Sequence, residues 1–383
     1  MTSLLTATAN TSANPGVGPS LVELTWAGGA TSSLLSLWLR DNAPELLHAS
    51  TRHRVVETST IPDDVHPSDC ALIDGALHVT WAHDGHTSVY SADWLRANDY
   101  SNGARHAVAQ PTLWDASAAS AIPRAVWPEL LADNELRRDF LRGFCDYGLA
   151  LLSGVPNEPG TVLEVGAELG IVRSTSWGTV FDVVSMVDAN SVAYTNLALV
   201  VHTDEGYRDP APTIQLQHFL RSDTSGGAAT LTDGFKVAAD LRATRPDLFQ
   251  LLVDHSLQFH FADATAEHAA TGPVITLSPE GELHSIRYSN HSARPFLLPA
   301  EVMGPYYEAY RAFGRMRESE QYQLRLDMRA GEMYLVDNRR VMHGRTGFSG
   351  GGARHLQSCY IERDELVSRL TVLERQLNGG RDG

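Results

Sequence analysis

The sequence predicts a mainly β fold with flanking helices, in which a double-sheet jelly roll follows a small β-rich N-terminal domain. Three observations support this prediction. Short apolar runs recur along the chain, with Gly, Pro, Asn and Asp at the turns between them. A few stretches with helical periodicity flank these runs. The length of 383 residues suits one large domain and one small domain.

Composition and charge exclude several classes of protein. Hydrophobic residues make up 43% of the chain and charged residues 20%, as in ordinary soluble domains. No apolar run is long enough to span a membrane. The net charge of −16, without a cluster of Lys and Arg, disfavours nucleic-acid binding. The 3 cysteines are too scattered for a disulfide scaffold. We therefore expect a cytoplasmic protein that binds neither nucleic acids nor membranes.

Changes in composition divide the chain into four segments. Residues 1–20 lack the basic start and apolar stretch of a signal peptide, so we expect a disordered tail. Residues 21–102 contain an alternating strand at Ala76–Trp81 and several turn signals, which indicates a small β-rich domain. Residues 103–123 are rich in Ala, Ser and Pro and are predicted to be a linker. Residues 124–383 form the larger domain.

The larger domain combines apolar strands with amphipathic helices. Leu136, Phe140 and Phe144 lie on one stripe of a predicted helix over 135–147, and Gly148 ends that helix. Further helices are expected at 161–169, at 235–255 (one helix or two) and at 364–377. Strands are expected at 149–152, 197–201, 213–219, 332–336 and 354–361.

A His-x-Asp triplet, His202-Thr203-Asp204, directly follows one of these strands. Side chains two residues apart on a strand point to the same face, so the triplet presents an imidazole and a carboxylate side by side. His343 is the candidate third ligand. Two His and one carboxylate on one face of an octahedron leave three positions open, which is typical of non-haem Fe(II) oxygenases.

The triplet alone has little specificity, because about one such triplet is expected by chance in a chain with this much His and Asp. Arg354, eleven residues after His343, adds specificity. An Arg at that offset, on the next strand of a jelly roll, can form a bidentate pair with a carboxylate of a metal-bound co-substrate.

A series of ordered motifs covers nearly the whole chain. In the N-terminal part they are Leu37-Trp38-Leu39-Arg40-Asp41-Asn42 and Ala92-Asp93-Trp94-Leu95. In the larger domain they are Asn190 to Thr195, His202 to Asp204, Gly226-Gly227, Asp233-Gly234-Phe235, Asp337-Asn338-Arg339, His343-Gly344-Arg345 and Arg354 to Gln357. The chain thereby resembles the Fe(II)/2-oxoglutarate-dependent oxygenases of the γ-butyrobetaine hydroxylase and trimethyllysine hydroxylase branch of the taurine-dioxygenase-like superfamily.

The resemblance implies a double-stranded β-helix core, a homodimer, Fe(II) as the metal, and 2-oxoglutarate and O2 as co-substrates. His202, Asp204 and His343 would hold the Fe(II), and Arg354 would meet the far carboxylate of 2-oxoglutarate. Family members often carry a hydroxyl side chain two residues after the Gly-Gly pair, whereas here Thr230 stands one place late. Either a bulge returns Thr230 to the co-substrate, or Arg354 acts with less help.

The resemblance also marks a substrate pocket. In the betaine hydroxylases aromatic rings surround a trimethylammonium group, which ring faces attract by cation–π interaction. The matching positions are Trp177, Phe181, Tyr194 and Tyr360. At the polar end of the pocket, Ser191 stands where the family has Asn, and Asn290 matches a second family Asn. The alternative for the aromatic set is that its members are core residues.

One family feature is missing from the N-terminal domain. This branch usually carries three Cys and a distant His that hold structural zinc, and here only His86 matches. Because structural zinc strongly prefers Cys, we expect no zinc. The domain would instead depend on apolar burial by Trp38, Leu39, Trp81 and Trp94.

The expected function is therefore hydroxylation of an unactivated C–H bond in a small cationic substrate. The resemblance favours a quaternary-ammonium, amino-acid-like compound such as γ-butyrobetaine, with release of succinate and CO2. A hydroxylase or desaturase of another amino-acid-derived metabolite is the alternative on the same scaffold. A catalytically silent jelly-roll binding protein and a hydrolytic zinc enzyme are the alternatives from other classes.

Overall fold

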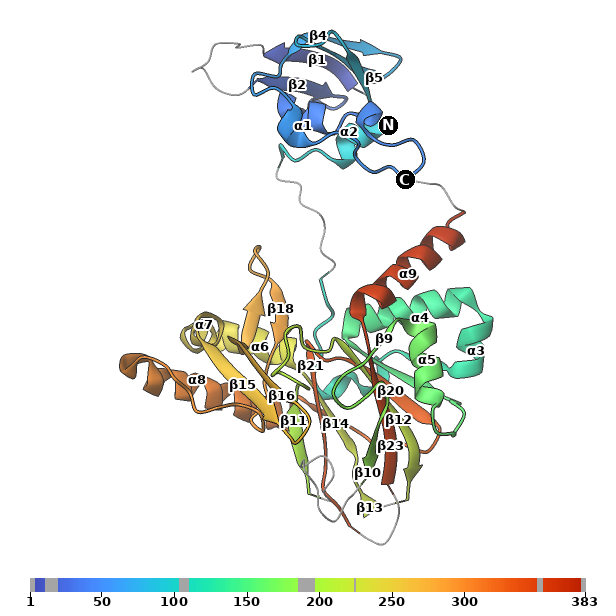
Figure 1. The fold of residues 1–383 in the computed structure, drawn as a ribbon, viewed down its shortest axis with the longest axis vertical. Coiled ribbons are helices and arrows are strands. Elements are labelled where there is room, and N and C mark those ends of the chain that lie inside the picture. Colours follow the sequence, from blue (N-terminus) through green and yellow to red (C-terminus); the bar gives the residue numbers. More distant parts are fainter. Residues whose placement is uncertain are drawn as a thin grey trace. The chain divides into compact units, whose positions relative to one another are not determined.

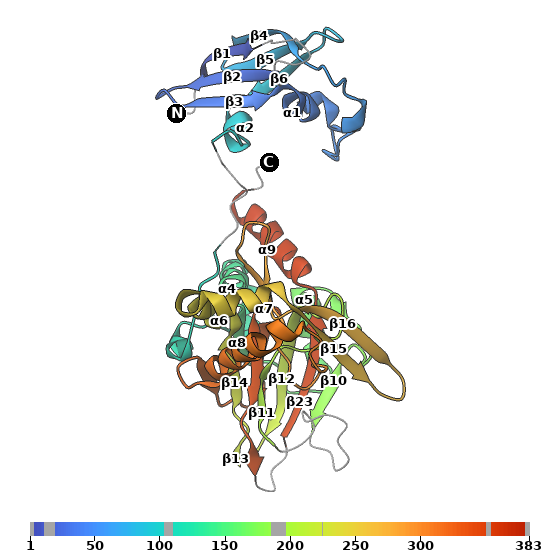
Figure 2. The same ribbon diagram turned by 90° about the vertical axis from the view of Figure 1, so that its left-hand side faces the viewer.

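The computed structural model describes residues 4–10, 20–102, 110–184, 197–223, 225–349 and 354–379. The chain folds as two compact units, Met1–Val108 and Ala109–Gly383. Figures 1 and 2 show the elements of each unit in two views. None of the helices described is long and apolar enough to cross a membrane.

The N-terminal unit contains two three-stranded antiparallel sheets. Alternate residues of their strands bury Val22, Leu24 and Trp26 together with Leu77 and Trp81 in one core. The first sheet is β1 (Leu4–Asn10), β2 (Leu21–Trp26) and β3 (Thr31–Leu35), and the second is β4 (Pro67–Ile73), β5 (Ala76–Trp81) and β6 (Thr87–Ser91). The short helices are α1 (Ser36–Asp41) and α2 (Ala92–Ala97), with 3-10 turns at Pro44–Leu46 and Thr58–Thr60.

Two expectations about segment boundaries differ from the structure. Residues 4–10, expected to lie in a disordered tail, pair with β2 as the edge strand β1. From residue 110 onward the expected linker belongs to the second unit, because the Trp114 side chain is buried in the core of that unit. Its backbone amide also donates to the Asp233 carboxylate. Pairing at a sheet edge and burial of one aromatic ring are tertiary effects that local composition does not reveal.

Ion pairs occupy the part of the N-terminal unit where the resemblance would place zinc. Arg40 contacts the carboxylates of Glu45 and Asp84 at 2.9 and 3.0 Å. His86 Nε2 lies 3.1 Å from the same Glu45 carboxylate. Within the described residues, no group of three potential metal ligands gathers there.

The larger unit is built on two β-sheets. The major sheet has the order β10-β23-β12-β20-β8-β7, with β9 also pairing with β23, and it is antiparallel except between β7 and β8. The minor sheet has the order β11-β21-β14-β19. The major strands are β7 (Arg124–Val126), β8 (Leu149–Ser153), β9 (Val172–Arg173), β10 (Phe181–Val184), β12 (Ile214–Ser222), β20 (Glu332–Asp337) and β23 (Arg354–Ile361). The minor strands are β11 (Leu199–His202), β14 (Ala229–Asp233), β19 (Gln323–Leu326) and β21 (Val341–Arg345).

The two sheets pack face to face as a jelly roll, as the sequence predicts. Between them a core joins Phe219 and Tyr334 of the major sheet to Leu231 and Val341 of the minor sheet. Helices α4, α5 and α9 cover the other face of the major sheet, and α6, α7 and α8 lie beside the minor sheet (Figure 1). The helices are α3 (Trp127–Ala132), α4 (Asn134–Tyr147), α5 (Thr161–Leu169), α6 (Gly234–Thr244), α7 (Pro246–Asp254), α8 (Ala300–Glu318) and α9 (Arg363–Leu377).

Local sequence signals explain where several helices begin and end. The Asp133 carboxylate accepts from two amides in the first turn of α4, and Gly148, with a φ of 67°, ends that helix. Pro246 is the first residue of α7. Additional short strands form hairpins or pairs: β13 (Ser225–Gly226) with β22 (Phe348–Ser349), β15 (Ser256–Ala262) with β16 (Glu267–Pro273), and β17 (Ile275–Leu277) with β18 (Leu283–Ile286). A 3-10 helix covers Ala116–Ser120.

Candidate functional site

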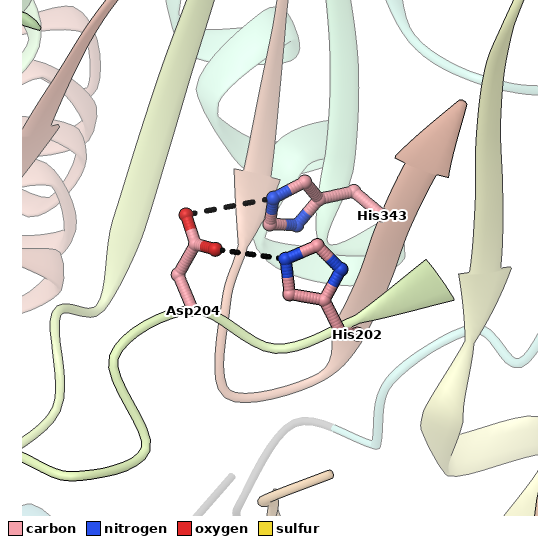
Figure 3. Close-up of side chains that lie close together, drawn as sticks. All are labelled: His202, Asp204 and His343. Carbon is pink, nitrogen blue, oxygen red and sulfur yellow. Dashed lines mark ion pairs between the residues drawn. The ribbon is translucent and has the colours of Figure 1, made fainter. Parts of the chain in front are cut away.

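Strand pairing in the minor sheet brings the three predicted metal ligands together. His202 ends β11 and lies opposite His343 of β21 in the antiparallel register, and Asp204 follows in the turn after β11. The Nε2 atoms of His202 and His343 lie 3.2 and 3.5 Å from the two carboxylate oxygens of Asp204 (Figure 3). One ligand atom from each residue falls within 4.8 Å of the others. Two imidazoles and a carboxylate this close fit a divalent metal of the Fe(II) type.

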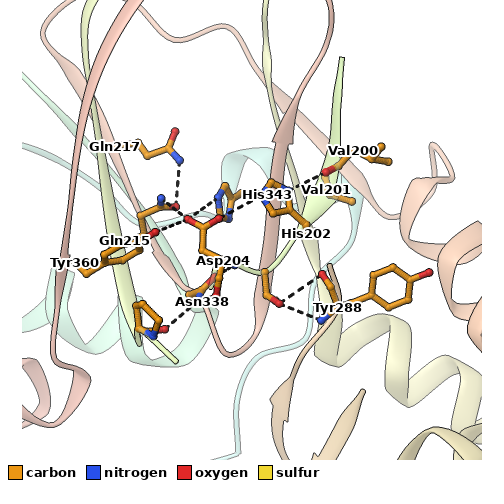
Figure 4. Close-up of polar contacts among 12 residues, drawn as sticks. Val200, Val201, His202, Asp204, Gln215, Gln217, Tyr288, Asn338, His343 and Tyr360 are labelled. Carbon is orange, nitrogen blue, oxygen red and sulfur yellow. Dashed lines mark hydrogen bonds and ion pairs between the residues drawn. The ribbon is translucent and has the colours of Figure 1, made fainter. Parts of the chain in front are cut away.

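Neighbouring side chains fix the orientation of the Asp204 carboxylate. Its Oδ2 accepts hydrogen bonds from Gln215 Nε2 at 2.6 Å and from the Tyr360 hydroxyl at 2.8 Å (Figure 4). The Asn338 side chain accepts from the Asp204 amide at 2.7 Å and donates to the Asp204 carbonyl at 3.0 Å. Such contacts orient a ligand before metal binds, and here they come from β12, from β23 and from the turn before β21.

The electrostatics of this cluster keep the carboxylate charged. Burial opposes ionisation of Asp204, but the adjacent His343 and His202 hold its pKa well below the usual value. Burial and the Asp204 charge raise the pKa of Tyr360 well above its usual value, so its hydroxyl stays protonated and donates. His202 Nδ1 lies 2.9 Å from the Val200 carbonyl oxygen, which can only accept. Nδ1 therefore carries the proton, and Nε2 is available to a metal.

Arg354 begins β23 and lines the same cavity as the three ligands. Its guanidinium lies 5.7 Å from the ring centroids of both Phe219 and Phe348. Burial lowers the pKa of Arg354. Among the described residues no carboxylate pairs with it, and its Nε has no hydrogen-bond partner. A partly buried guanidinium with this open donor capacity suits an anionic ligand.

Thr230 does not join this arrangement. Strand β14 pairs with β21 in a regular register, with Leu231 opposite His343 and Thr230 opposite Gly344. Paired residues share a face, so Thr230 lies on the opposite face from His343. The bulge that would return its hydroxyl to the cavity is not present in this strand pair, and Thr230 does not line the cavity.

The cavity in front of the ligands has a volume of about 390 Å³. Trp177, Phe181 and Tyr360 line it, as the expected aromatic cage requires. Ser191 and Tyr194 lie outside the described residues. Asn290 instead lines a neighbouring groove, where its Oδ1 accepts from the Tyr310 hydroxyl at 3.4 Å.

Sequence reasoning missed several residues that line the cavity. Phe261 of β15 packs against Trp177 and Tyr207, with ring centroids 5.2 and 5.1 Å apart, and so extends the aromatic wall. Glu205, directly after the ligand Asp204, is buried with a positive φ of 48° and forms an ion pair with Arg208. Burial raises the pKa of Glu205 to about 7. Other residues that line the cavity include Gln215, Gln217, His260, His291, Tyr334 and Arg345.

A three-ligand metal cluster inside a jelly roll, facing a cavity with a partly buried arginine, is typical of the class of non-haem Fe(II) oxygenases. Comparisons with known proteins agree. Residues 107–360 match the family described as taurine catabolism dioxygenase TauD, TfdA family, and residues 18–96 match the γ-butyrobetaine hydroxylase-like N-terminal family. The chain belongs to the TauD/TfdA family.

Two curated relatives and one solved structure illustrate the likeness. The chain is 36% identical to a γ-butyrobetaine dioxygenase of Pseudomonas sp. (strain AK-1), over 92% of this chain and 94% of the relative. It is 30% identical to the mitochondrial trimethyllysine dioxygenase of Bos taurus, over 89% of this chain and 82% of the relative. A crystal structure of an asparagine oxygenase superposes with a TM-score of 0.48 at 20% identity, covering 59% of this chain and 79% of that chain.

These findings confirm the family resemblance that the sequence motifs indicate. The protein is a 2-oxoglutarate-dependent dioxygenase, with Fe(II) as its metal and 2-oxoglutarate and O2 as co-substrates. The two alternatives from other classes, a silent binding protein and a zinc hydrolase, are thereby set aside.

Proposed function

We propose that this enzyme hydroxylates an unactivated C–H bond of a small quaternary-ammonium, amino-acid-like substrate, with γ-butyrobetaine as the leading candidate. The observation that supports this proposal is the aromatic wall of Trp177, Phe181 and Tyr360 in the cavity of the metal ligands. A quaternary ammonium group cannot donate hydrogen bonds, whereas ring faces attract it by about 0.5–2 kcal/mol for each contact. The relatives named for γ-butyrobetaine and trimethyllysine, both quaternary ammonium compounds, agree with this choice.

In this proposal each side chain at the site has a defined task. His202, Asp204 and His343 would hold Fe(II), which supplies the O2 chemistry that couples decarboxylation of 2-oxoglutarate to insertion of oxygen into a C–H bond. Gln215 and Tyr360 orient the Asp204 carboxylate through their hydrogen bonds. Arg354 and the aromatic wall would act on different molecules.

Arg354 would bind the far carboxylate of 2-oxoglutarate through charge-assisted hydrogen bonds worth about 1.5–3 kcal/mol each. The aromatic wall would hold the substrate cation and exclude water from the reacting C–H bond. The protein thus supplies position and electrostatics rather than acid–base chemistry. The homodimer and cytoplasmic location stay predictions.

A second substrate class is favoured by one feature of the cavity. Glu205 places a buried carboxylate beside the aromatic wall. A carboxylate can accept hydrogen bonds from a cation with N–H groups, which a quaternary ammonium group lacks. An amine or guanidine derivative of an amino acid is therefore the second candidate, with hydroxylation or desaturation as its outcome.

Succinate formation with a panel of co-incubated compounds tests the proposal. Betaines, trimethyllysine and free amino acids would be compared under Fe(II), 2-oxoglutarate and O2, with the His343→Ala variant as the inactive control. We expect a quaternary-ammonium acid to stimulate succinate release and to gain one oxygen by mass spectrometry. Stimulation only by compounds that lack a quaternary ammonium group would refute the quaternary-ammonium assignment and favour the second class.

A further inference from the structure

Arg208 joins three segments of the larger unit. It stands in the turn after β11, and its guanidinium forms an ion pair with the buried carboxylate of Glu205 in the same turn. Its Nη2 donates to Ser176 Oγ, which belongs to the connection between β9 and β10, at 2.8 Å. The same Nη2 lies 3.3 Å from His268 Nε2 of β16. The arginine side chain is only 16% exposed, so these contacts are partly shielded from water.

Ser176 belongs to a tight turn that carries a residue of the cavity wall. The turn runs from Thr175 to Gly178, and these two residues exchange backbone hydrogen bonds of 3.0 Å. Trp177, next to Ser176, lines the cavity and packs in the aromatic wall. The flanking strands β9 and β10 both pair with β23, so the major sheet holds the two ends of this connection. The hydrogen bond from Arg208 to Ser176 holds its tip.

The contacts of Arg208 make it a strong anchor. The Glu205 side chain, 4% exposed, holds the guanidinium in place, because breaking a buried ion pair leaves a charge without compensation. The planar guanidinium then presents further N–H groups in a fixed direction, one of them toward Ser176. A hydrogen bond from a charged donor is also stronger than one between neutral groups. The tip of the Thr175–Gly178 turn is therefore fixed relative to the turn that carries the metal ligand Asp204.

We propose that Arg208 is a positioning residue for substrate binding, which acts through Ser176 to hold the Trp177 ring in the cavity wall. The inference rests on the proposed function, in which that ring contacts the substrate cation. A ring face attracts a cation only when it lies close to the cation, and a loose turn must be ordered at the expense of affinity. Substrate affinity should therefore depend on Arg208 more than the rate at saturating substrate does.

Hydrogen–deuterium exchange of the Fe(II)-loaded, substrate-free protein tests the effect on the turn. Two variants are compared. Glu205→Gln should keep the hydrogen bond from Arg208 to Ser176, and Glu205→Gln/Arg208→Met then removes its donor without leaving a buried carboxylate unpaired. Relative to Glu205→Gln, the amides of residues 175–178 in the double variant should exchange about tenfold faster, the effect of losing one charge-assisted hydrogen bond.

Succinate release with γ-butyrobetaine tests the consequence for the substrate. From Glu205→Gln to the double variant, the Michaelis constant for γ-butyrobetaine should rise about threefold to thirtyfold, as loss of one cation–π contact predicts. The rate at saturating substrate and the Michaelis constant for 2-oxoglutarate should change less than about twofold. The same step in a Trp177→Ala background should leave the Michaelis constant for γ-butyrobetaine unchanged, because the ring through which Arg208 acts is already absent.

Two further variants complete the design. Ser176 is exposed, so Ser176→Ala removes the acceptor hydroxyl at little risk to folding, and it should show both effects at smaller size. Arg142→Gln removes a guanidinium that lies 2.6 Å from the Glu374 carboxylate and joins α4 to α9, and it should change neither exchange nor the Michaelis constant.

The outcomes separate this inference from the proposed function. Unchanged exchange of residues 175–178 in the double variant and in Ser176→Ala would overturn the inference. Faster exchange with an unchanged Michaelis constant, or an equal rise of that constant in the Trp177→Ala background, would overturn it as well. A parent enzyme whose succinate release responds to no quaternary-ammonium compound would instead contradict the proposed function.

Discussion

The Tyr360 hydroxyl offers a sharp test of how the metal site is built, because its position suggests two different roles. Its ring lines the cavity, and the centroids of the Tyr360 and Phe181 rings lie 5.5 Å apart, as a substrate cage requires. Its hydroxyl donates to Asp204 Oδ2 at 2.8 Å, as support for a metal ligand requires. Replacing Tyr360 with Phe removes the second role and keeps the first. The variant therefore separates metal support from substrate binding.

The size of the effect follows from the contacts of Asp204. A hydrogen bond to a charged group contributes about 1.5–3 kcal/mol. Gln215 still donates to the same oxygen at 2.6 Å, so the carboxylate stays partly oriented and the lower figure applies. About 1.5 kcal/mol corresponds to roughly a tenfold weaker metal affinity, at the low end of the range for such supporting residues. The Michaelis constant for substrate should change less.

Metal affinity is measured by titrating Mn(II) into the metal-free protein and following the free-ion signal by electron paramagnetic resonance. Tyr306→Phe is the matched control, since the Tyr306 hydroxyl is buried with no hydrogen-bond partner among the described residues. That variant should bind Mn(II) like the parent protein. If Tyr360→Phe also keeps the parent affinity within twofold, the hydroxyl does not support the metal ligand and the reasoning fails.

Three further changes have defined outcomes. Gly344→Ala should weaken Mn(II) binding and lower the melting temperature, because the new Cβ would collide with the Leu199 carbonyl oxygen and separate β11 from β21. Mn(II) binding like that of the parent protein in the same titration would contradict this expectation. Asp233→Asn should lower the free energy of unfolding by about 3–5 kcal/mol in urea denaturation, because it leaves the buried Arg340 guanidinium, 2.7 Å away, without its counter-charge. Burial lowers the pKa of His218 from 6.5 to about 4, so the unfolded chain binds a proton that the folded chain excludes. The free energy of unfolding should therefore fall by about 3 kcal/mol as the pH drops from 6.5 to 4. The His218→Phe variant should show a weaker dependence of this free energy on pH.

Much of the fold follows from local patterns in the sequence. The helix predicted over 161–169 is α5 with the same bounds, and the strand predicted over 354–361 is β23. Helix α8 (Ala300–Glu318) gave no clear signal and was not predicted; it contains Pro305, and its buried face is rich in tyrosine. The edge strand β1 was missed because its pairing depends on β2 rather than on its own residues.

The candidate site was predictable where chemistry depends on residue type and order. The motif spacing identified the three ligands and Arg354, and the structure brings all four to one cavity. The motif spacing left open which face of β14 carries Thr230, because a shift of one residue in the strand register decides that face. It also missed the donors to Asp204, because Gln215 lies on a different strand and nothing in its neighbours marks it.

The distribution of charge in the cavity shows how one small space could accept two molecules of opposite charge. Asp204 and Glu205 lie in the turn after β11, whereas Arg345 ends β21 and Arg354 begins β23. The metal that Asp204 holds would offset its charge, and Arg208 pairs with Glu205, so the two arginines remain to attract a dicarboxylate. The ring faces of the aromatic wall would attract a cationic substrate instead. Because Arg345 is only 5% exposed, salt in the solvent screens its charge poorly. The arginines and the aromatic rings would then direct co-substrate and substrate to different parts of the same cavity.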